Sequence, residues 1–225
     1  MTSRAGALRQ TARRRGGRPP RLQAEQIREQ ILEVATPLFL NEGYGATSIE
    51  EVAKRARMSK RTLYSRFRDK AELFGAVVHR LVERLRPPNT TPEQFFEGHS
   101  IDAILERLAR LILRAALSPP ALALHRVILA EATRFPELAE AVNQEGARRE
   151  AIRHIAAFLE GETLAGALTV PKPEFAAEQF LHMLVSGPQR RALGLGTPMA
   201  GEALDAWARD TVDLFLNGCR RASAG

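Results

Sequence analysis

The sequence predicts an all-α protein made of a small N-terminal three-helix domain and a larger helical bundle, and three observations support this. Apolar residues recur three and four positions apart through most of the chain, which is the period of an amphipathic helix. Serine, threonine and aspartate stand at the starts of several of these segments, where they can cap helices. The alternation of apolar and polar residues that marks a half-buried strand is absent.

The first predicted helix begins near Ala24 and ends at "NEGYG", where Gly43 suits a left-handed C-cap. Pro37 lies inside this helix. An interior proline costs about 3 kcal/mol and bends the axis, so we expect the helix to be kinked or broken there. Its apolar stripe consists of Ile27, Ile31, Val34, Ala35, Leu38 and Phe39.

Three further cap signals divide the rest of this domain. Thr47 and Ser48 each precede a glutamate by three positions, so a capping box is available in either register. Ser59 caps the short segment "KRTLYSRF", and Asp69 caps the helix that starts at residue 70. "PPN" at 87–89 ends that helix and marks a domain boundary.

Beyond this boundary all signals are helical. The expected helices lie near 92–117, 119–134, 136–159, 173–193 and 200–217. The resulting division is a disordered basic arm at 1–21, a helix-turn-helix domain at 22–86 and a second helical domain at 90–217.

The net charge of +7 is concentrated at the N-terminus. Residues 1–21 hold seven arginines and no acid, residues 22–86 hold twelve basic and nine acidic residues, and residues 87–225 hold fourteen and seventeen. A basic front on a mildly acidic body indicates a polyanion that meets the front of the molecule.

Several functional classes lack support in the sequence. No run of about 18 apolar residues exists, which argues against a membrane partner, and no apolar segment follows the basic N-terminus, which argues against a secretory signal. A single cysteine, Cys219, argues against disulfides within the chain and against a cysteine-rich metal site, and suits the cytoplasm. No HExxH, G-x-S-x-G or P-loop motif appears, so we predict no enzymatic activity, no cofactor and no metal.

The segment after Ser59 has the features of a DNA-reading helix. Leu63 and Phe67, four residues apart, can dock it on the domain while its basic and hydroxyl side chains face outward. A major groove admits one α-helix, and Lys or Arg there pairs with guanine. The alternative is a solvated basic face on a structural helix, but the capped helix-turn-helix frame favours the DNA-reading interpretation.

Other parts of the N-terminal region can contact the DNA backbone. A phosphate fits the N-terminus of the helix that follows Thr47 and Ser48, and Lys70 can close the same clamp. In "RRRGGRPP", the arginines either enter a narrow minor groove or form a nonspecific basic tail, and both alternatives stay open. The predicted DNA-binding residues are Arg15, Arg18, Thr47, Ser48, Ser59, Lys60, Arg61, Thr62, Tyr64, Ser65, Arg66 and Lys70.

Residues 27–74 resemble the DNA-binding domain of TetR-family transcriptional regulators. The family pattern joins A-x-x-L-F-x-x-x-G-Y, T-[ST]-x-x-x-[IV]-A and S-x-x-T-[LF]-Y-x-x-F-x-x-K-x-x-L. One departure is Arg57, where the turn usually has glycine; a left-handed conformation there costs about 1–2 kcal/mol. The matching residues are Ala35, Leu38, Phe39, Gly43, Tyr44, Thr47, Ser48, Val52, Ala53, Ser59, Thr62, Leu63, Tyr64, Phe67, Lys70 and Leu73.

The second domain, 90–217, resembles the regulatory domain of AefR-like members through "HRVILAEATRFPELAEAV" and "PEFAAEQFLHMLVSGPQRRALGLG". The resemblance implies a homodimer in which the last two helices of each subunit pack together. For any single residue on these helices, a place in the core of its own subunit is the alternative. The implied interface residues are Phe175, Gln179, His182, Met183, Ser186, Trp207, Val212, Leu214 and Phe215.

The resemblance also implies a small-molecule effector of unknown identity, bound among the helices from 92 to 193. The candidate ligand-binding residues, which are alternatively ordinary core or surface groups, are His125, Arg126, Glu131, His154 and His182. The implied function is a ligand-responsive regulator, commonly a repressor, that binds a palindromic operator in double-stranded DNA. The rival hypothesis is an architectural DNA-binding protein without an effector.

Overall fold

The computed structural model describes residues 21–85, 100–138, 140 and 147–219, and the regular elements within these ranges are α-helices. The all-α prediction is confirmed. The predicted arm at 1–21, including Arg15 and Arg18, lies outside the described residues except for Arg21. Residues 92–99 of the predicted helix at 92–117 lie outside them too.

The N-terminal part contains α1 (Arg21–Glu42), α2 (Ile49–Arg55), α3 (Lys60–Tyr64) and α4 (Lys70–Leu85). Helix α1 continues through Pro37, so a break at that residue is wrong. The reason is tertiary: Leu38 and Phe39, directly after the proline, are fully buried in the core and hold the last turn in place.

The two short helices match their cap signals but differ in length from the prediction. Ser48, rather than Thr47, caps α2 by accepting a hydrogen bond from the amide of Glu51. Ser59 caps α3 in the same way, but α3 ends at Tyr64 instead of continuing to Phe67. The amides of residues 66 and 67 both donate to the carbonyl oxygen of Leu63, at 2.9 and 3.0 Å, which closes the helix into a turn.

The second part contains α6 (Ile101–Ala116), α7 (Pro119–Glu131), α9 (Ala147–Leu164), α10 (Pro173–Ala192) and α11 (Glu202–Cys219). Helix α7 ends three residues earlier than predicted because the amides of Arg134 and Phe135 turn back to the carbonyl oxygen of Glu131. Helix α9 continues five residues beyond the predicted end at 159. Residues 136–138 are helical as predicted, but 141–146 lie outside the described residues.

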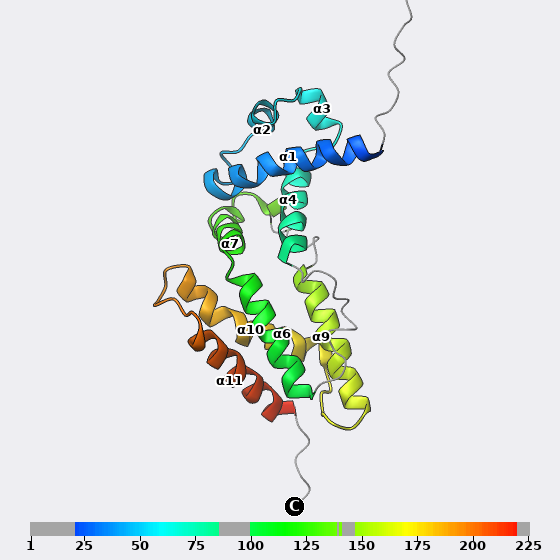
Figure 1. The fold of residues 1–225 in the computed structure, drawn as a ribbon, viewed down its shortest axis with the longest axis vertical. Helices are drawn as coiled ribbons and strands as arrows, with labels where there is room; N and C mark the ends of the chain where they lie inside the picture. The colour runs from blue at the N-terminus through cyan, green and yellow to red at the C-terminus, as the bar shows by residue number, and fades with distance from the viewer. Residues whose placement is uncertain (1–20, 86–99, 139, 141–146, 220–225) are drawn as a thin grey trace, which may run out of the picture.

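Two hydrophobic clusters hold these helices together, and they do not follow the predicted boundary. The first is built on α1–α4 but also contains Val127 of α7 and Leu138. The second joins α6, α9, α10 and α11. Helix α7 therefore packs against α1 and α4, and it links the two parts of the elongated molecule (Figure 1).

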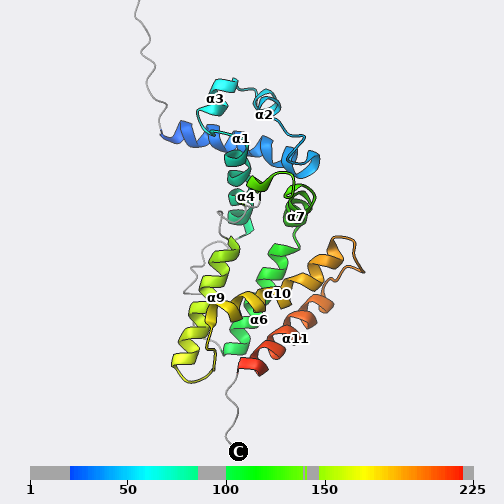
Figure 2. The same cartoon turned by 180° about the vertical axis from the view of Figure 1, so that it is seen from behind.

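Helices α2 and α3 lie at one end of the molecule, and α11 ends near the other (Figures 1 and 2). Within the described ranges, no single helix is long and apolar enough to cross a membrane. Only α6 and α7 taken together reach the required length and hydropathy, and they are bent by 64° at the break between them.

Candidate nucleic-acid interface

Helix α3 presents a polar and basic face at the end of the molecule. Leu63 and, in the turn after it, Phe67 are fully buried and anchor the segment in the first cluster, as the four-residue spacing predicts. The guanidinium of Arg28 stands 4.6 Å from the centre of the Phe67 ring and covers its outer side. Lys60, Arg61, Tyr64 and Ser65 are exposed, and Thr62 is half-buried.

The polar side chains of α3 are held in place by local contacts. The Ser59 hydroxyl accepts from the amide of Thr62 and shares a hydrogen bond with the Thr62 hydroxyl at 2.8 Å. The Ser65 hydroxyl donates to the carbonyl oxygen of Thr62. Lys60 pairs with Glu50 of α2 at 3.2 Å, an exposed contact that a phosphate can replace at little cost. This face can therefore offer cations and hydroxyls to a groove, with Lys60 exchanging Glu50 for a phosphate.

A shallow pocket of about 480 Å³ lies beside this face, between the N-terminus of α2, the end of α3 and the start of α4. Ser48, the exposed N-cap of α2, lines this pocket. The N-terminus of a helix attracts anions. Tyr64 is 48% exposed and forms part of the pocket wall. Lys70 lines the opposite side. The pocket offers hydroxyl donors and the cations of Arg68 and Lys70 to a backbone phosphate. It also contains the carboxylates of Glu50 and Asp69, which pair with Lys60 and Arg68.

Lys70 has more partners than the sequence indicated. Its ammonium donates to the carbonyl oxygen of Tyr44 at 2.9 Å and stands 4.2 Å from the centre of the Tyr44 ring. Burial lowers the pKa of Lys70, and the nearby carboxylates of Glu131 and Glu137 oppose that shift. Lys70 therefore ties α4 to the turn between α1 and α2, in addition to lining the pocket.

Two predicted DNA-binding residues require correction. Thr47 lines the pocket beside α3, but it is only 2% exposed and its hydroxyl donates to the carbonyl oxygen of Gly43 at 2.7 Å, so this side chain holds the turn and leaves little surface for DNA. Arg66 lies in the turn after α3 instead of on its outer face. It is half-buried, and its Nε is buried without a hydrogen-bond partner among the described residues.

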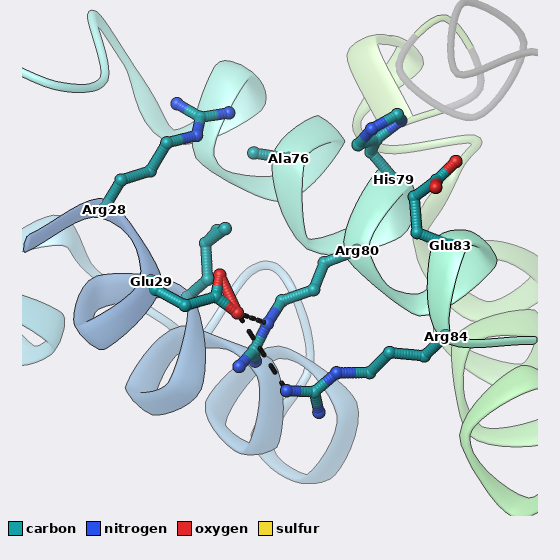
Figure 3. Close-up of a pocket in the computed structure, with 8 residues that line it drawn as sticks. Arg28, Glu29, Ala76, His79, Arg80, Glu83 and Arg84 are labelled. Carbon is teal, nitrogen blue, oxygen red and sulfur yellow. Dashed lines mark hydrogen bonds and ion pairs between the residues drawn. The ribbon is translucent and has the colours of Figure 1, made fainter. Parts of the chain in front are cut away.

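A second hollow, of about 390 Å³, lies between α1 and α4 and is lined mainly by charged side chains (Figure 3). Arg80 of α4 is buried and donates from Nε to Glu29 of α1, with Glu33 at 3.4 Å from its terminal nitrogen. Figure 3 shows Arg80 and Arg84 both joined to the carboxylate of Glu29, the latter at 4.0 Å. These ion pairs join α1 to α4, so we assign the charged residues of this hollow a structural role instead of a ligand-binding one.

The five candidate ligand-binding residues lie on three helices, α7, α9 and α10. His125 is half-buried, and burial lowers its pKa, while Arg126 on the same helix is exposed. His154 of α9 pairs with Glu150, and His182 of α10 contacts Arg148 at 2.7 Å. The most direct correction concerns Glu131, whose carboxylate accepts hydrogen bonds from the amides of Tyr44 and Gly45 and so contacts the N-terminal part.

The predicted interface residues divide into two groups. Val212 and Phe215 are buried in the second cluster of their own subunit, so their assignment to the interface is wrong. Trp207 donates from its indole to the carbonyl oxygen of Leu184 and packs α11 on α10. The cause is that apolar residues occur on both the inner and the outer face of α11, and the sequence does not show which face points into the subunit. The residues that remain exposed are Phe175, Gln179, His182, Ser186 and Leu214, with Met183 half-buried.

Cys219 packs against the second cluster at the end of α11, and burial raises the pKa of its thiol. Its carbonyl oxygen accepts a hydrogen bond from the amide of Thr169 at 2.7 Å, which ties the segment after α9 to α11. This environment suits a packing role for the residue. Among the described residues, no group of three or more histidine, cysteine, aspartate or glutamate side chains is arranged to hold a metal ion.

Comparison with protein families decides the classification. Residues 31–77 match the model for bacterial regulatory proteins of the tetR family. Residues 103–218, more than half of the chain, match the model of the AefR-like transcriptional repressor C-terminal domain. The chain belongs to the TetR family of transcriptional regulators.

Curated TetR-family relatives match over part of their length. The transcriptional activator FasR of Mycolicibacterium smegmatis is 40% identical over 86 residues, which are 35% of this chain and 39% of FasR. The regulator AcrR of Shigella flexneri is 37% identical over 60 residues, or 27% of this chain and 28% of AcrR. The chain thus matches well under half the length of these relatives.

Solved structures of TetR-family proteins match nearly the whole fold. The Flavonoid-responsive Regulator FrrA is 32% identical, with a TM-score of 0.72, over 88% of this chain and 100% of FrrA. A TetR-family regulator from Mesorhizobium loti MAFF303099 is 28% identical, with a TM-score of 0.72, over 88% of this chain and 99% of its own. The helix-turn-helix and the helical second part therefore have the arrangement found in this family.

Proposed function

We propose that this protein is a ligand-responsive repressor that binds a palindromic operator in double-stranded DNA as a homodimer. The observation that carries the proposal is the exposed face of α3, with Lys60, Arg61 and Tyr64 held outward by a capped and anchored turn. Two such helices, presented by a twofold dimer, fit successive major grooves about one DNA turn apart. For a protein that binds such an operator, the expected location is the cytoplasm.

The proposed DNA contacts divide by chemistry. Lys60 and Arg61 supply cations for base edges or phosphates, and Tyr64 adds a hydroxyl at the edge of the α3 face. Ser48, at the N-terminus of α2, and Lys70 are placed to hold one backbone phosphate in the pocket between them. The arm residues Arg15 and Arg18 lie outside the described residues and stay predictions.

The regulatory half of the proposal is supported by the relatives. FrrA, by its name, responds to flavonoids, and it matches this chain over its whole length. Ligand binding to one state of a dimer shifts the population toward that state, and a preference of a few kcal/mol is enough to release DNA. The effector pocket is expected among the helices of the second part, which match the AefR-like C-terminal domain.

Selection of bound sequences from random duplex DNA tests the proposal. A repressor enriches a few palindromic sites, and a subsequent screen of small molecules finds one that releases the enriched duplex. Broad binding to A·T-rich DNA without a preferred site contradicts the proposal and favours an architectural protein. FasR is named an activator, so a reporter placed behind the selected operator determines the sign of regulation.

A further inference from the structure

A carboxylate from the second part of the molecule forms hydrogen bonds with the backbone of the turn that precedes α2. Glu131, the last residue of α7, accepts a hydrogen bond at Oε1 from the amide of Tyr44 and at Oε2 from the amide of Gly45, at 2.8 and 2.6 Å. Each carboxylate oxygen therefore holds one of two consecutive backbone donors. Hydrogen bonds of this charge-assisted kind are stronger than those between neutral groups.

Gly45 makes this approach possible. Its backbone does not have a positive φ, so conformation alone does not require glycine there. Glycine is required because there is no space for a side chain. A Cβ on residue 45 would lie 2.8 Å from Oε2 of Glu131 and 3.1 Å from the ring of Phe135. An alanine at this position would have to displace the carboxylate, which is the flexible end of the Glu131 side chain.

The remaining contacts hold the same turn from its other sides. Lys70 of α4 donates to the carbonyl oxygen of Tyr44, and the rings of Tyr44 and Phe135 meet edge to face with centroids 5.2 Å apart. The Tyr44 hydroxyl lies 3.3 Å from Glu137. Burial, followed by the charge of Glu137, raises the pKa of Tyr44, so its hydroxyl stays a donor. Residues from both sides of the predicted domain boundary, Lys70 on one side and Glu131 and Glu137 on the other, thus contact Tyr44.

This turn leads directly into the proposed phosphate site. Gly45, Ser48 and Lys70 all line the pocket beside α3. A displacement of the turn therefore moves the first turn of α2 and one wall of the pocket together. Glu131 acts on the pocket through these backbone donors and through its charge near Lys70, and it lies on α7, outside the exposed α3 face.

We infer that Glu131 is a positioning residue for DNA binding: its bidentate contact with Tyr44 and Gly45 fixes the turn that forms one wall of the pocket beside α3. The inference rests on the proposed function. It makes α7 a direct connection between the second part of the molecule and the DNA-binding surface, separate from the covalent connection through α4. A movement of α7 against α1 is then expected to change the shape of this pocket.

Two variants test this from opposite sides of the contact. Glu131→Gln keeps the size of the side chain but replaces one acceptor oxygen by a donor, and Gly45→Ala pushes the carboxylate away. We expect each to weaken binding of the full chain to the selected operator by about tenfold, because each removes a charge-assisted hydrogen bond. The comparison variant is Glu137→Gln, which removes a nearby negative charge but alters a carboxylate that meets the Tyr44 hydroxyl instead of the backbone amides of the turn, with an expected change below about twofold.

Two further readouts separate positioning from mere stability. If phosphate contacts are lost, the slope of log affinity against log salt falls by about one for each contact, whereas a less stable but unchanged binding surface keeps its slope. Hydrogen exchange without DNA should be faster at the amides of Tyr44 and Gly45 in Glu131→Gln than in the wild type. The double variant Gly45→Ala/Glu131→Gln should bind no more weakly than the worse single variant, because both remove the same contact.

The outcomes distinguish this inference from the proposed function. Wild-type affinity and wild-type salt slope in both single variants, measured well below their melting temperatures, overturn the inference alone. Unchanged exchange at the two amides in Glu131→Gln overturns it as well, without reference to DNA. Failure of the wild-type protein to enrich any duplex contradicts the proposed function and removes the basis of the inference with it.

Discussion

Arg57 is the residue at which the local backbone departs most from what its side chain prefers. Among the described residues it is the only non-glycine with a positive φ, at 54°. It lies in the turn between α2 and α3, and the amide of the next residue, Met58, donates to the carbonyl oxygen of Ala53 at 2.9 Å. The left-handed conformation thus closes α2 and fixes where α3 begins, as expected if the turn keeps its family geometry.

We predict that Arg57→Gly stabilises the protein. The left-handed conformation costs an arginine about 1–2 kcal/mol, while glycine loses about 0.5–1 kcal/mol more conformational freedom on folding, so the net gain is below about 1.5 kcal/mol. Chemical denaturation measures the free energy of unfolding. The control Lys54→Gly, at an exposed position inside α2, should instead lose about 1 kcal/mol. A loss of stability in Arg57→Gly would show that the arginine side chain compensates for the strain.

Tyr64 provides the corresponding test of DNA contact. Because its side chain is exposed and lies at the junction of α3 with the phosphate pocket, Tyr64→Ala should weaken operator binding by roughly tenfold to a hundredfold, or about 1–3 kcal/mol. The melting temperature should stay close to that of the wild type. Tyr64→Phe separates the hydroxyl from the ring. If both variants bind the operator like the wild type, Tyr64 is not a contact.

At the scale of elements, the packing of α1 against α4 holds the N-terminal part together. Both helices contribute to the first cluster, and Arg80 adds a polar joint whose guanidinium side chain is 9% exposed. Its partners Glu29 and Glu33 are exposed, so water screens part of the attraction. The joint ties the second half of α4 to the first half of α1.

Replacing Arg80 by methionine should lower the free energy of unfolding by about 1–3 kcal/mol, because the hydrogen bonds to Glu29 and Glu33 are lost. Arg84→Met is the matched control on the same helix face. Arg84 is exposed and 4.0 Å from Glu29, so the expected loss is below about 0.5 kcal/mol. Equal effects of the two substitutions, measured by urea denaturation, would contradict the assignment of the joint to Arg80.

At the scale of the whole molecule, two exposed apolar residues on the last two helices fit the proposed dimer. Phe175 of α10 is 61% exposed and Leu214 of α11 is 66% exposed. Apolar residues of this size gain most when a partner covers them, at about 25 cal/mol for each Å² of buried surface. The same argument excludes Val212 and Phe215, whose surface the subunit itself already buries.

We therefore predict that Phe175→Glu and Leu214→Glu convert a dimer into monomers, because each places a charge in an apolar contact. Sedimentation or light scattering gives the mass directly. Leu164→Glu serves as a control, because Leu164 at the end of α9 is 84% exposed but lies outside α10 and α11. Dimers that persist in both interface variants, or dissociate equally in the control, would place the interface elsewhere.

Local sequence patterns were enough to predict the helical class, the Ser59 cap of α3 and the buried pair Leu63 and Phe67, because periodicity and capping depend on neighbours a few positions apart. Only the tertiary structure decided that α1 passes through Pro37, that Val212 faces inward, and that Glu131 grips the turn at Tyr44. These outcomes depend on which surfaces meet across long stretches of chain. The contact between Glu131 and Tyr44 spans 87 positions, and no local pattern records it.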